Sequence, residues 1–183
     1  MSSWWNAAIL LTLARLAAIP FVVAAILSGR RIQALAIFCA AAATDLLDGA
    51  LARRYHLATE LGAKLDPVAD KLFLSAVFLA LAATGTVPWW LVWVVFSRDF
   101  VLLAGSLIAM RSLRLRRFPP SLAGKASTFL QITYTFSAML HHAAPEAGIG
   151  LWTAALAWPV AALTVASGLH YLWRGLAQSP IRG

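Results

Sequence analysis

The sequence contains few charged residues, and acidic ones are the rarest. Charged residues make up 12% of the 183 positions, and only seven of them are acidic. A soluble domain usually carries about 25% charged residues. Hydrophobic residues make up 61% of the chain, and largely apolar windows of about 20 residues recur, each long enough to cross a hydrocarbon core about 30 Å thick. The composition therefore excludes an ordinary soluble enzyme and predicts an integral membrane protein.

Cysteine and long polar linkers are also scarce. The one cysteine, Cys39, lies in the apolar run "AIFCAAA", which excludes an intramolecular disulfide and gives no sign of redox chemistry. No long polar linker divides the chain, so we expect a single transmembrane catalytic domain over residues 1–183. The net charge is +8, but the basic residues border the apolar runs. They indicate contact with anionic lipid headgroups, and we expect no nucleic-acid partner.

The apolar runs predict an all-α fold of six transmembrane helices. Breakers rich in Gly and Pro separate the runs, for example "SGRR" at 28–31 and "TGTVP" at 84–88. The predicted helices cover residues 5–27, 32–53, 61–83, 88–111, 121–142 and 149–173.

Lys and Arg are distributed unequally between the two ends of these helices. The connections at 53–64 and 111–125 and the C-terminal segment hold most of them, whereas the opposite end receives Arg30 and Arg31. Basic loops stay on the cytoplasmic side. Both termini are therefore expected to be cytoplasmic, in a protein of the bacterial inner membrane. His141 and His142 fall at the opposite end, where we expect interfacial polar residues with no catalytic role.

Five of the seven acidic residues lie in one stretch, "TDLLDGALARRYHLATELGAKLDPVADK", at 44–71. Asp45 and Asp48 are three residues apart on the second predicted helix, which puts them on one face. Asp66 and Asp70 are four apart on the third and also share a face. A short connection makes these helices antiparallel neighbours, so the two pairs should converge near the cytoplasmic boundary.

Four carboxylates held together repel one another and need a cation. One alternative is ion pairing with the nearby basic residues Arg53, Arg54, Lys64 and Lys71. The other is a site for divalent metal, since carboxylate oxygens suit Mg²⁺, Mn²⁺ and Ca²⁺, and four of them suffice for two ions. The symmetrical spacing favours metal. A third hypothesis, from another functional class, is a cation or proton transporter. It predicts polar groups spread across the bilayer depth, whereas this sequence concentrates them at one boundary.

The helix that carries Asp45 also carries small residues on the same face. Gly49 and Ala52 fall within about 40° of Asp45 around the helix, and Arg53 within about 80°. Small residues let a ligand approach the backbone closely, and a guanidinium adds a charge-assisted contact. Gly62 gives a similar notch before Asp66. This face suits a metal-bound diphosphate. A metal-dependent membrane prenyltransferase is an alternative that also uses aspartate pairs, but it would not need the Gly, Ala and Arg between them.

The stretch "D-LL-DG-AL-AR-RYHLATEL-G-AKL-D-PVA-D" fits the pattern D-x2-D-G-x2-A-R-x8-G-x3-D-x3-D. This pattern resembles the signature of the CDP-alcohol phosphotransferases, integral membrane enzymes of phospholipid synthesis. All eight fixed positions over 26 residues are present. The resemblance extends to "NAAILLTLARLAAIP" at 6–20, "SRD" at 97–99 and "SLAGKASTFLQ" at 121–131, and so covers nearly the whole six-helix fold.

The resemblance implies a role for each motif residue. Two divalent cations, Mg²⁺ or Mn²⁺, would be held by Asp45, Asp48, Asp66 and Asp70. Asp66 and Asp70 would be the catalytic carboxylates, with Asp70 as the general base that activates an acceptor alcohol to attack the β-phosphorus and expel CMP. The donor, CDP-diacylglycerol, would be bound by Asp48, Gly49, Ala52, Arg53 and Gly62. Thr12 and Arg15 are further candidates to reach the donor headgroup, and a homodimer is implied by the resemblance alone.

The acceptor is left open between two alcohols. The resemblance is about equal to phosphatidylglycerophosphate synthases, which use glycerol 3-phosphate, and to cardiolipin synthases, which use phosphatidylglycerol. "SRDF" leans toward the second group, because glycerophosphate-using relatives commonly show Glu at the position of Asp99. A phosphatidylinositol-phosphate-type synthase is a further alternative. Arg98, Arg111 and Lys125 are the candidate acceptor-binding residues, and a local Arg98–Asp99 salt bridge is the alternative for Arg98.

Overall fold

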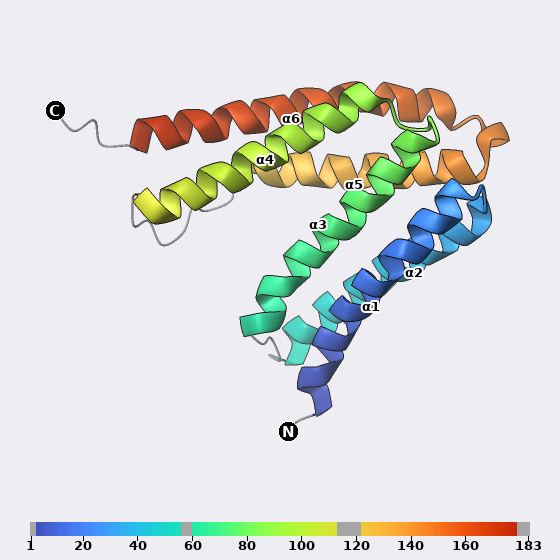
Figure 1. Cartoon of the computed structure of the whole chain (residues 1–183), viewed down its shortest axis with the longest axis horizontal. Helices are drawn as coiled ribbons and strands as arrows, with labels where there is room; N and C mark the ends of the chain where they lie inside the picture. Colours follow the sequence, from blue (N-terminus) through green and yellow to red (C-terminus); the bar gives the residue numbers. More distant parts are fainter. Residues whose placement is uncertain (1–2, 56–59, 113–121, 179–183) are drawn as a thin grey trace. The chain divides into compact units, whose positions relative to one another are not determined.

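The protein is described here by a computed structural model of the whole chain. It describes the backbone of residues 3–55, 60–112 and 122–178, and the side chains of residues 12–44, 68–105 and 124–173. This part of the chain contains six α-helices, one short 3-10 turn and no strand (Figure 1). The helices are α1 Ser3–Leu27, α2 Arg31–Tyr55, α3 Glu60–Ala83, α4 Trp89–Ser112, α5 Leu122–Ala143 and α6 Gly150–Gln178, and the 3-10 turn is Pro145–Ala147.

The all-α prediction and its six helices are confirmed. Each predicted end lies within two residues of the observed one, with one exception: α6 continues to Gln178, five residues beyond the predicted end. The prediction ended this helix at Trp173, the last residue before Arg174. The following segment, "RGLAQ", contains good helix formers and no proline, so nothing in it stops the helix.

Glycines in the left-handed backbone conformation end α1 and α3. Gly29 has a φ of 68° and Gly85 a φ of 79°, values that glycine adopts without a Cβ clash. At the end of α1, the Gly29 amide donates to Ile26 O (3.1 Å) and the Arg30 amide to Ala25 O (2.9 Å). At the end of α3, Gly85 donates to Ala82 O (3.0 Å) and Thr86 to Leu81 O (3.0 Å). Both ends are Schellman motifs, so these terminal carbonyls are already hydrogen-bonded.

The chain divides into two compact units. The first consists of residues 1–87 and 138–147, and the second of residues 88–137 and 148–183. In the first unit, α1 packs against both α2 and α3. The rings of Phe38 and Phe73 stack with their centroids 5.9 Å apart, which brings α2 and α3 together. The core of this unit also contains four completely buried residues of α1 and α3: Val22, Ile26, Val77 and Leu81.

The second unit is held together around α6. This helix packs against α4, where the rings of Trp90 and Trp158 lie 5.3 Å apart. Hydroxyl groups join α6 to α5: Ser127 pairs with Thr164 (3.2 Å) and Ser137 with Thr153 (2.8 Å). Small hydroxyl residues at helix contacts are typical of membrane bundles, because they allow close approach and hydrogen-bond across the interface.

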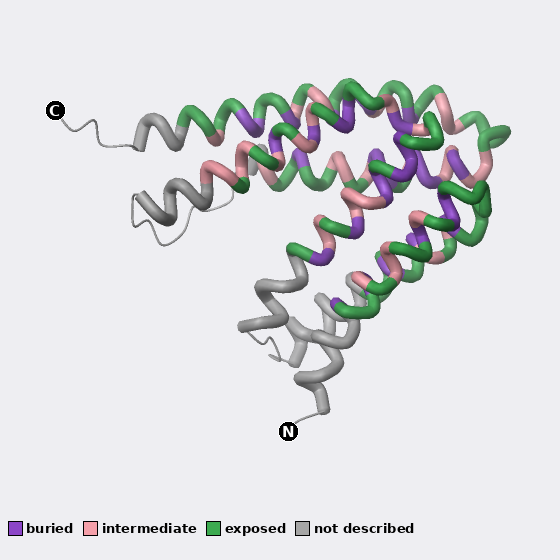
Figure 2. Tube along the Cα trace, viewed as in Figure 1, coloured by how far each residue is buried: buried purple, intermediate pink, exposed green. Residues whose placement is uncertain are grey.

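Exposed positions run along the described helices of both units (Figure 2), and many of them carry large apolar side chains. Every α-helix exposes large apolar residues, among them Phe21 (67%), Trp93 (69%) and Phe100 (72%). Several hydroxyl side chains are buried instead, including Thr12, Ser127 and Thr164. An apolar exterior, with hydroxyl groups buried between the helices, fits a hydrocarbon environment better than water. Within the described residues, one helix segment, Gly150–Trp173, is long and apolar enough to cross a membrane by itself, and Thr12–Leu27 and Arg31–Thr44 are shorter apolar stretches.

Candidate active site

The predicted site lies on two helices of the first unit. Asp45 and Asp48 belong to α2, and Asp66 and Asp70 to α3. The side chains of residues 45–67 lie outside the part that the structure describes, so the carboxylates of Asp45, Asp48 and Asp66 have no described geometry. Asp70 is the motif aspartate whose side chain is described.

Asp70 is paired with an arginine from another helix. Nη1 of Arg15, on α1, donates a hydrogen bond to Oδ1 of Asp70, on α3. The Arg15 side chain is 5% exposed and that of Asp70 is 37% exposed. A buried guanidinium is stable only when a carboxylate or comparable acceptor meets it. The pair therefore fixes the carboxylate of Asp70 against α1, while part of that carboxylate still faces outward.

This pairing was not predicted from the sequence. Thr12 and Arg15 were candidates to reach the donor headgroup, which stays a prediction; the structure pairs the Arg15 side chain with Asp70. Arg15 is the one charged residue of an apolar predicted helix. A buried charge of this kind requires a partner, and that requirement was the available signal.

The predicted donor-binding residues are helical, but their side chains are not described. Gly49, Ala52 and Arg53 lie on α2, and Gly62 lies on α3. All four fall within residues 45–67, outside the described side chains. Their role in donor binding stays a prediction.

The three predicted acceptor-binding residues lie in the second unit. Arg98 is buried, and its Nη1 donates to Oδ1 of Asp99 at 3.0 Å while its Nη2 donates to Oγ of Ser167 on α6 at 3.0 Å. This is the local salt bridge named above as the alternative. Arg111 lies on α4 with its side chain outside the described part, and Lys125 is exposed in the first turn of α5.

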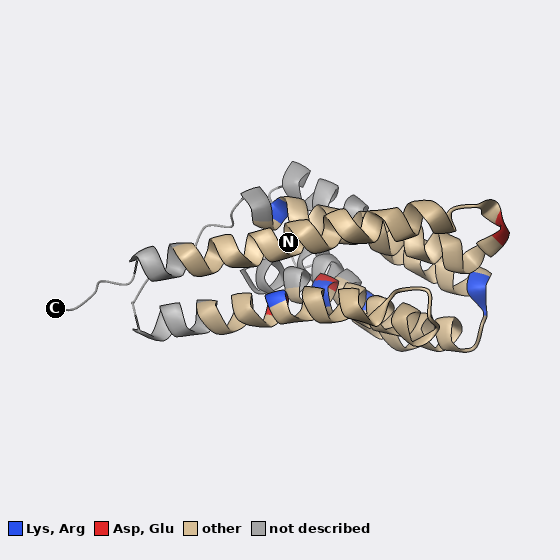
Figure 3. Ribbon diagram, turned by 90° about the horizontal axis from the view of Figure 1, so that it is seen from above, with Lys and Arg blue, Asp and Glu red and all other residues tan. Residues whose placement is uncertain are grey.

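Gly168 on α6 lies beside Arg98. A Cβ atom at Gly168 would lie 3.5 Å from Cγ of Arg98, an ordinary contact distance, so only a side chain longer than a methyl group would displace the arginine stem. Ser167, the next residue, supplies the hydroxyl that accepts from Arg98. Figure 3 shows that charged residues are sparse along the described helices. Arg98 is thus held rigidly, by two polar contacts and by close backbone packing.

Comparison with known proteins bears on the same residues. The family model described as CDP-alcohol phosphatidyltransferase matches residues 5–166, which include the whole motif from Asp45 to Asp70. The chain is 35% identical over 179 residues to the "Probable phosphatidylglycerophosphate synthase" of Mycobacterium tuberculosis, covering 93% of this chain and 82% of that protein.

Two other relatives carry different names. The chain is 32% identical over 152 residues to the CDP-diacylglycerol–glycerol-3-phosphate 3-phosphatidyltransferase of Bacillus subtilis, which covers 78% of this chain and 75% of the relative. It is 34% identical over 140 residues to the CMP-forming cardiolipin synthase of Streptomyces coelicolor, with 72% of this chain and 63% of the relative covered.

Proposed function

The chain belongs to the CDP-alcohol phosphatidyltransferase family, and from this premise we propose a metal-dependent transfer of the phosphatidyl group from CDP-diacylglycerol to glycerol 3-phosphate, with release of CMP. Phosphatidyl transfer from CDP-diacylglycerol follows from the family and from the names of its relatives. The complete motif between Asp45 and Asp70, inside the matched region, carries the proposal.

The register of α2 and α3 supports convergence of the two aspartate pairs. Asp45 lies seven residues after Phe38, and Asp66 lies seven residues before Phe73. The stacked rings of Phe38 and Phe73 give a common starting level for the two helices. Seven residues are about two turns, or about 10 Å, along an α-helix. Asp45 and Asp66 therefore reach the same level on antiparallel neighbours.

Divalent cations fit this set of donors. The motif supplies four carboxylates, and carboxylate oxygens are the ligands that Mg²⁺ and Mn²⁺ prefer. We propose that Asp45, Asp48, Asp66 and Asp70 hold two such ions. When bound, the ions would neutralise the diphosphate of the donor and stabilise the departing CMP.

Asp70 is the proposed general base. Arg15 holds one oxygen of its carboxylate, which restricts the rotation of the side chain and favours one orientation. The acceptor hydroxyl gives its proton to Asp70, its oxygen bonds to the β-phosphorus, and the bond from that phosphorus to CMP breaks. Gly49, Ala52 and Gly62 leave room for the nucleotide, and Arg53 contacts the diphosphate.

The membrane arrangement is part of the proposal. All six helices span the bilayer, both termini are cytoplasmic, and the two units form one catalytic domain that acts as a homodimer in the bacterial inner membrane. The apolar exterior of the described helices supports the membrane location, and the family match runs through both units. With the motif at the cytoplasmic boundary, a lipid donor keeps its acyl chains in the bilayer while its nucleotide reaches water.

A second acceptor, phosphatidylglycerol, is favoured by the names of several other relatives and by one residue. The Streptomyces coelicolor relative is named as a cardiolipin synthase. Position 99 is Asp in this chain, whereas glycerophosphate-using relatives commonly have Glu there, so this residue also favours the cardiolipin type. Glycerol 3-phosphate comes first because the Mycobacterium tuberculosis relative named for its product covers 93% of this chain, whereas the Streptomyces coelicolor cardiolipin synthase covers 72%.

One assay tests the reaction and the acceptor together. Purified protein receives Mg²⁺ or Mn²⁺ and CDP-diacylglycerol, each acceptor is added in turn, and CMP release is measured. We expect CMP with glycerol 3-phosphate and very little with Asp70→Asn. CMP with phosphatidylglycerol alone would establish the second acceptor instead. No CMP with any acceptor, including inositol phosphate, would contradict the proposed function.

A further inference from the structure

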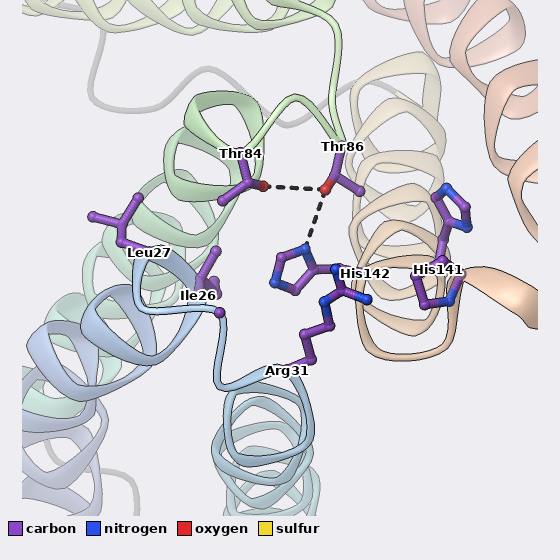
Figure 4. Close-up of a pocket in the computed structure, with 9 residues that line it drawn as sticks. Ile26, Leu27, Arg31, Thr84, Thr86, His141 and His142 are labelled. Atoms are coloured by element: carbon purple, nitrogen blue, oxygen red, sulfur yellow. Dashed lines mark hydrogen bonds between the residues drawn. The ribbon is translucent and has the colours of Figure 1, made fainter.

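A hollow of about 280 Å³ opens in the first unit, where α1 and α3 end and α2 begins. All residues that line it belong to that unit. Figure 4 shows Arg31 extending toward His142, which faces Thr86. The polar side chains around the hollow are Arg31, Thr84, Thr86, His141 and His142.

This hollow is separate from the aspartate motif. Arg31 precedes Asp45 by 14 residues, and Thr84 follows Asp70 by 14 residues. At 1.5 Å per residue, either helix puts about 21 Å between the hollow and the level of the motif. A ligand in the hollow is therefore not a ligand of the catalytic site.

Hydrogen bonds connect His142 to the end of α3. Thr84 Oγ1 lies 2.9 Å from the carbonyl oxygen of Leu81 and 3.1 Å from Thr86 Oγ1. Thr86 Oγ1 in turn lies 3.2 Å from Nδ1 of His142. These contacts orient the imidazole ring, which lines the hollow.

The groups around the hollow favour an anion. Arg31 is exposed, and its guanidinium makes no ion pair or hydrogen bond to any described residue. His142 is 9% exposed, and its Nε2 has no partner within the described residues. Among the described residues, no carboxylate lines the hollow, and Glu146, the acidic residue nearest to it in sequence, is exposed.

The helix ends strengthen this preference. The carbonyls that close α1 and α3 are hydrogen-bonded in the two Schellman motifs, which weakens their attraction for a cation. The N-terminus of α2, a helix of 25 residues, begins at Arg31. The dipole of this helix is positive at its N-terminus and attracts anions.

The rim of the hollow suits an amphiphilic ligand. Leu27, which lines the hollow, is 56% exposed, and Ile32, next to Arg31, is 69% exposed. The hollow lies at the ends of two apolar stretches, Thr12–Leu27 and Arg31–Thr44. A cation flanked by apolar side chains at such a level matches the border between phosphate groups and acyl chains.

We propose that this hollow binds a phosphate group, held by the guanidinium of Arg31 with His142 beside it. A phospholipid headgroup and inorganic phosphate share this chemistry. Arg binds phosphate through paired charge-assisted hydrogen bonds, and the hollow has the volume for a headgroup. The site does not depend on the proposed catalytic function.

Arg30 offers a matched control for Arg31. It is exposed and adjacent, but it does not line the hollow. The full-length protein is stripped of lipid in detergent, and bound phosphatidylglycerol is measured by native mass spectrometry. Diacylglycerol, which lacks phosphate, serves as the lipid control, and inorganic phosphate is added as a competitor. Arg31→Gln, Arg30→Gln and His142→Gln are compared with the unmodified chain.

We expect Arg31→Gln to weaken phosphatidylglycerol binding about tenfold, because a hydrogen bond to a charged group is lost. Arg30→Gln should bind as the unmodified chain does. His142→Gln keeps a hydrogen-bond partner for Thr86 and should bind within a few-fold of the unmodified chain, because Arg31 supplies the charge. If millimolar phosphate competes with phosphatidylglycerol, the phosphate group alone is sufficient for binding. If it does not compete, binding requires the lipid headgroup.

Two results would overturn the site. One is equal binding by Arg31→Gln and the unmodified chain; the other is an equal loss in Arg30→Gln and Arg31→Gln, which would indicate general attraction to basic surface. Because phosphatidylglycerol is also a candidate acceptor, CMP release is measured on the same preparations. Arg31→Gln should retain it, and a protein that releases no CMP still reports on the hollow.

Discussion

The guanidinium of Arg15, on α1, donates a hydrogen bond to the carboxylate of Asp70, on α3, across 55 residues of sequence. The arginine is almost fully buried, and the aspartate remains partly exposed. Asp70, the last carboxylate of the motif, is thus positioned by α1, a helix that lies outside the motif. If Asp70 is the base, then α1 determines which way the base points.

The first prediction concerns the coupling of these two residues. Asp70→Asn should lower kcat about 1,000-fold, since it removes the general base. Arg15→Gln should lower kcat about 10- to 100-fold, because the carboxylate loses its orientation. Since both changes act on one group, the double variant should be no slower than Asp70→Asn alone. Initial rates of CMP release from all four proteins measure this.

Arg15→Lys is the control for charge. It keeps a cation near Asp70 but loses the planar geometry of the guanidinium, and we expect part of the activity to return. If the losses of the two single variants multiply in the double variant, Arg15 acts independently of Asp70. A large rise in KM for CDP-diacylglycerol with unchanged kcat would then assign Arg15 to the donor.

The second prediction concerns the metal. Treatment with a chelator should abolish CMP release, and Mn²⁺ or Mg²⁺ should restore it. Asp45→Asn and Asp66→Asn should each require at least tenfold more metal for half-maximal rate, because each loses a carboxylate ligand. Glu60→Gln, in the same stretch but outside the motif, should show the metal dependence of the unmodified protein. Full activity after chelation would instead favour ion pairing of the aspartates with neighbouring Arg and Lys.

The third prediction concerns Arg98. Its two contacts, to Asp99 and to Ser167, are both 3.0 Å long. Ser167→Ala removes one acceptor of the buried guanidinium and should lower the stability in detergent by about 1–3 kcal/mol. If Arg98 also binds the acceptor, Ser167→Ala should raise the KM for glycerol 3-phosphate a few-fold and leave the KM for CDP-diacylglycerol unchanged. If Ser167→Ala leaves the KM of both substrates as in the unmodified protein, Arg98 has a structural role alone.

The helices were predictable because their determinants are local. Apolar runs end at Gly29, at Gly85 and at Pro88, and each of these residues acts through its own backbone. Helical spacing also assigned each aspartate pair to one face. The end of α6 was predicted five residues too early, at Trp173, although no proline follows it before Gln178.

The contacts between distant residues were not predictable in the same way. Periodicity assigns Arg15 to a helix, but it does not say that Asp70 is its partner. His141 and His142 were expected to be ordinary interfacial residues, and no sequence pattern connects His142 with Thr86, 56 positions away. Such pairs depend on which helices meet and at what level, and that depends on packing over the whole unit.

The last prediction compares two glycines at the contact of α4 and α6. A Cβ at Gly105 would lie 3.0 Å from Cε1 of Tyr171, whereas a Cβ at Gly168 would lie 3.5 Å from the nearest atom, in Arg98. Alanine favours a helix over glycine by about 1 kcal/mol. Gly168→Ala should therefore be neutral or stabilising, while in Gly105→Ala the clash with the tyrosine ring costs about 1–3 kcal/mol and outweighs that gain. Thermal unfolding in detergent should give a lower midpoint for Gly105→Ala than for Gly168→Ala. The reverse order would mean that the Tyr171 ring moves aside freely and that α4 and α6 are not closely packed at Gly105.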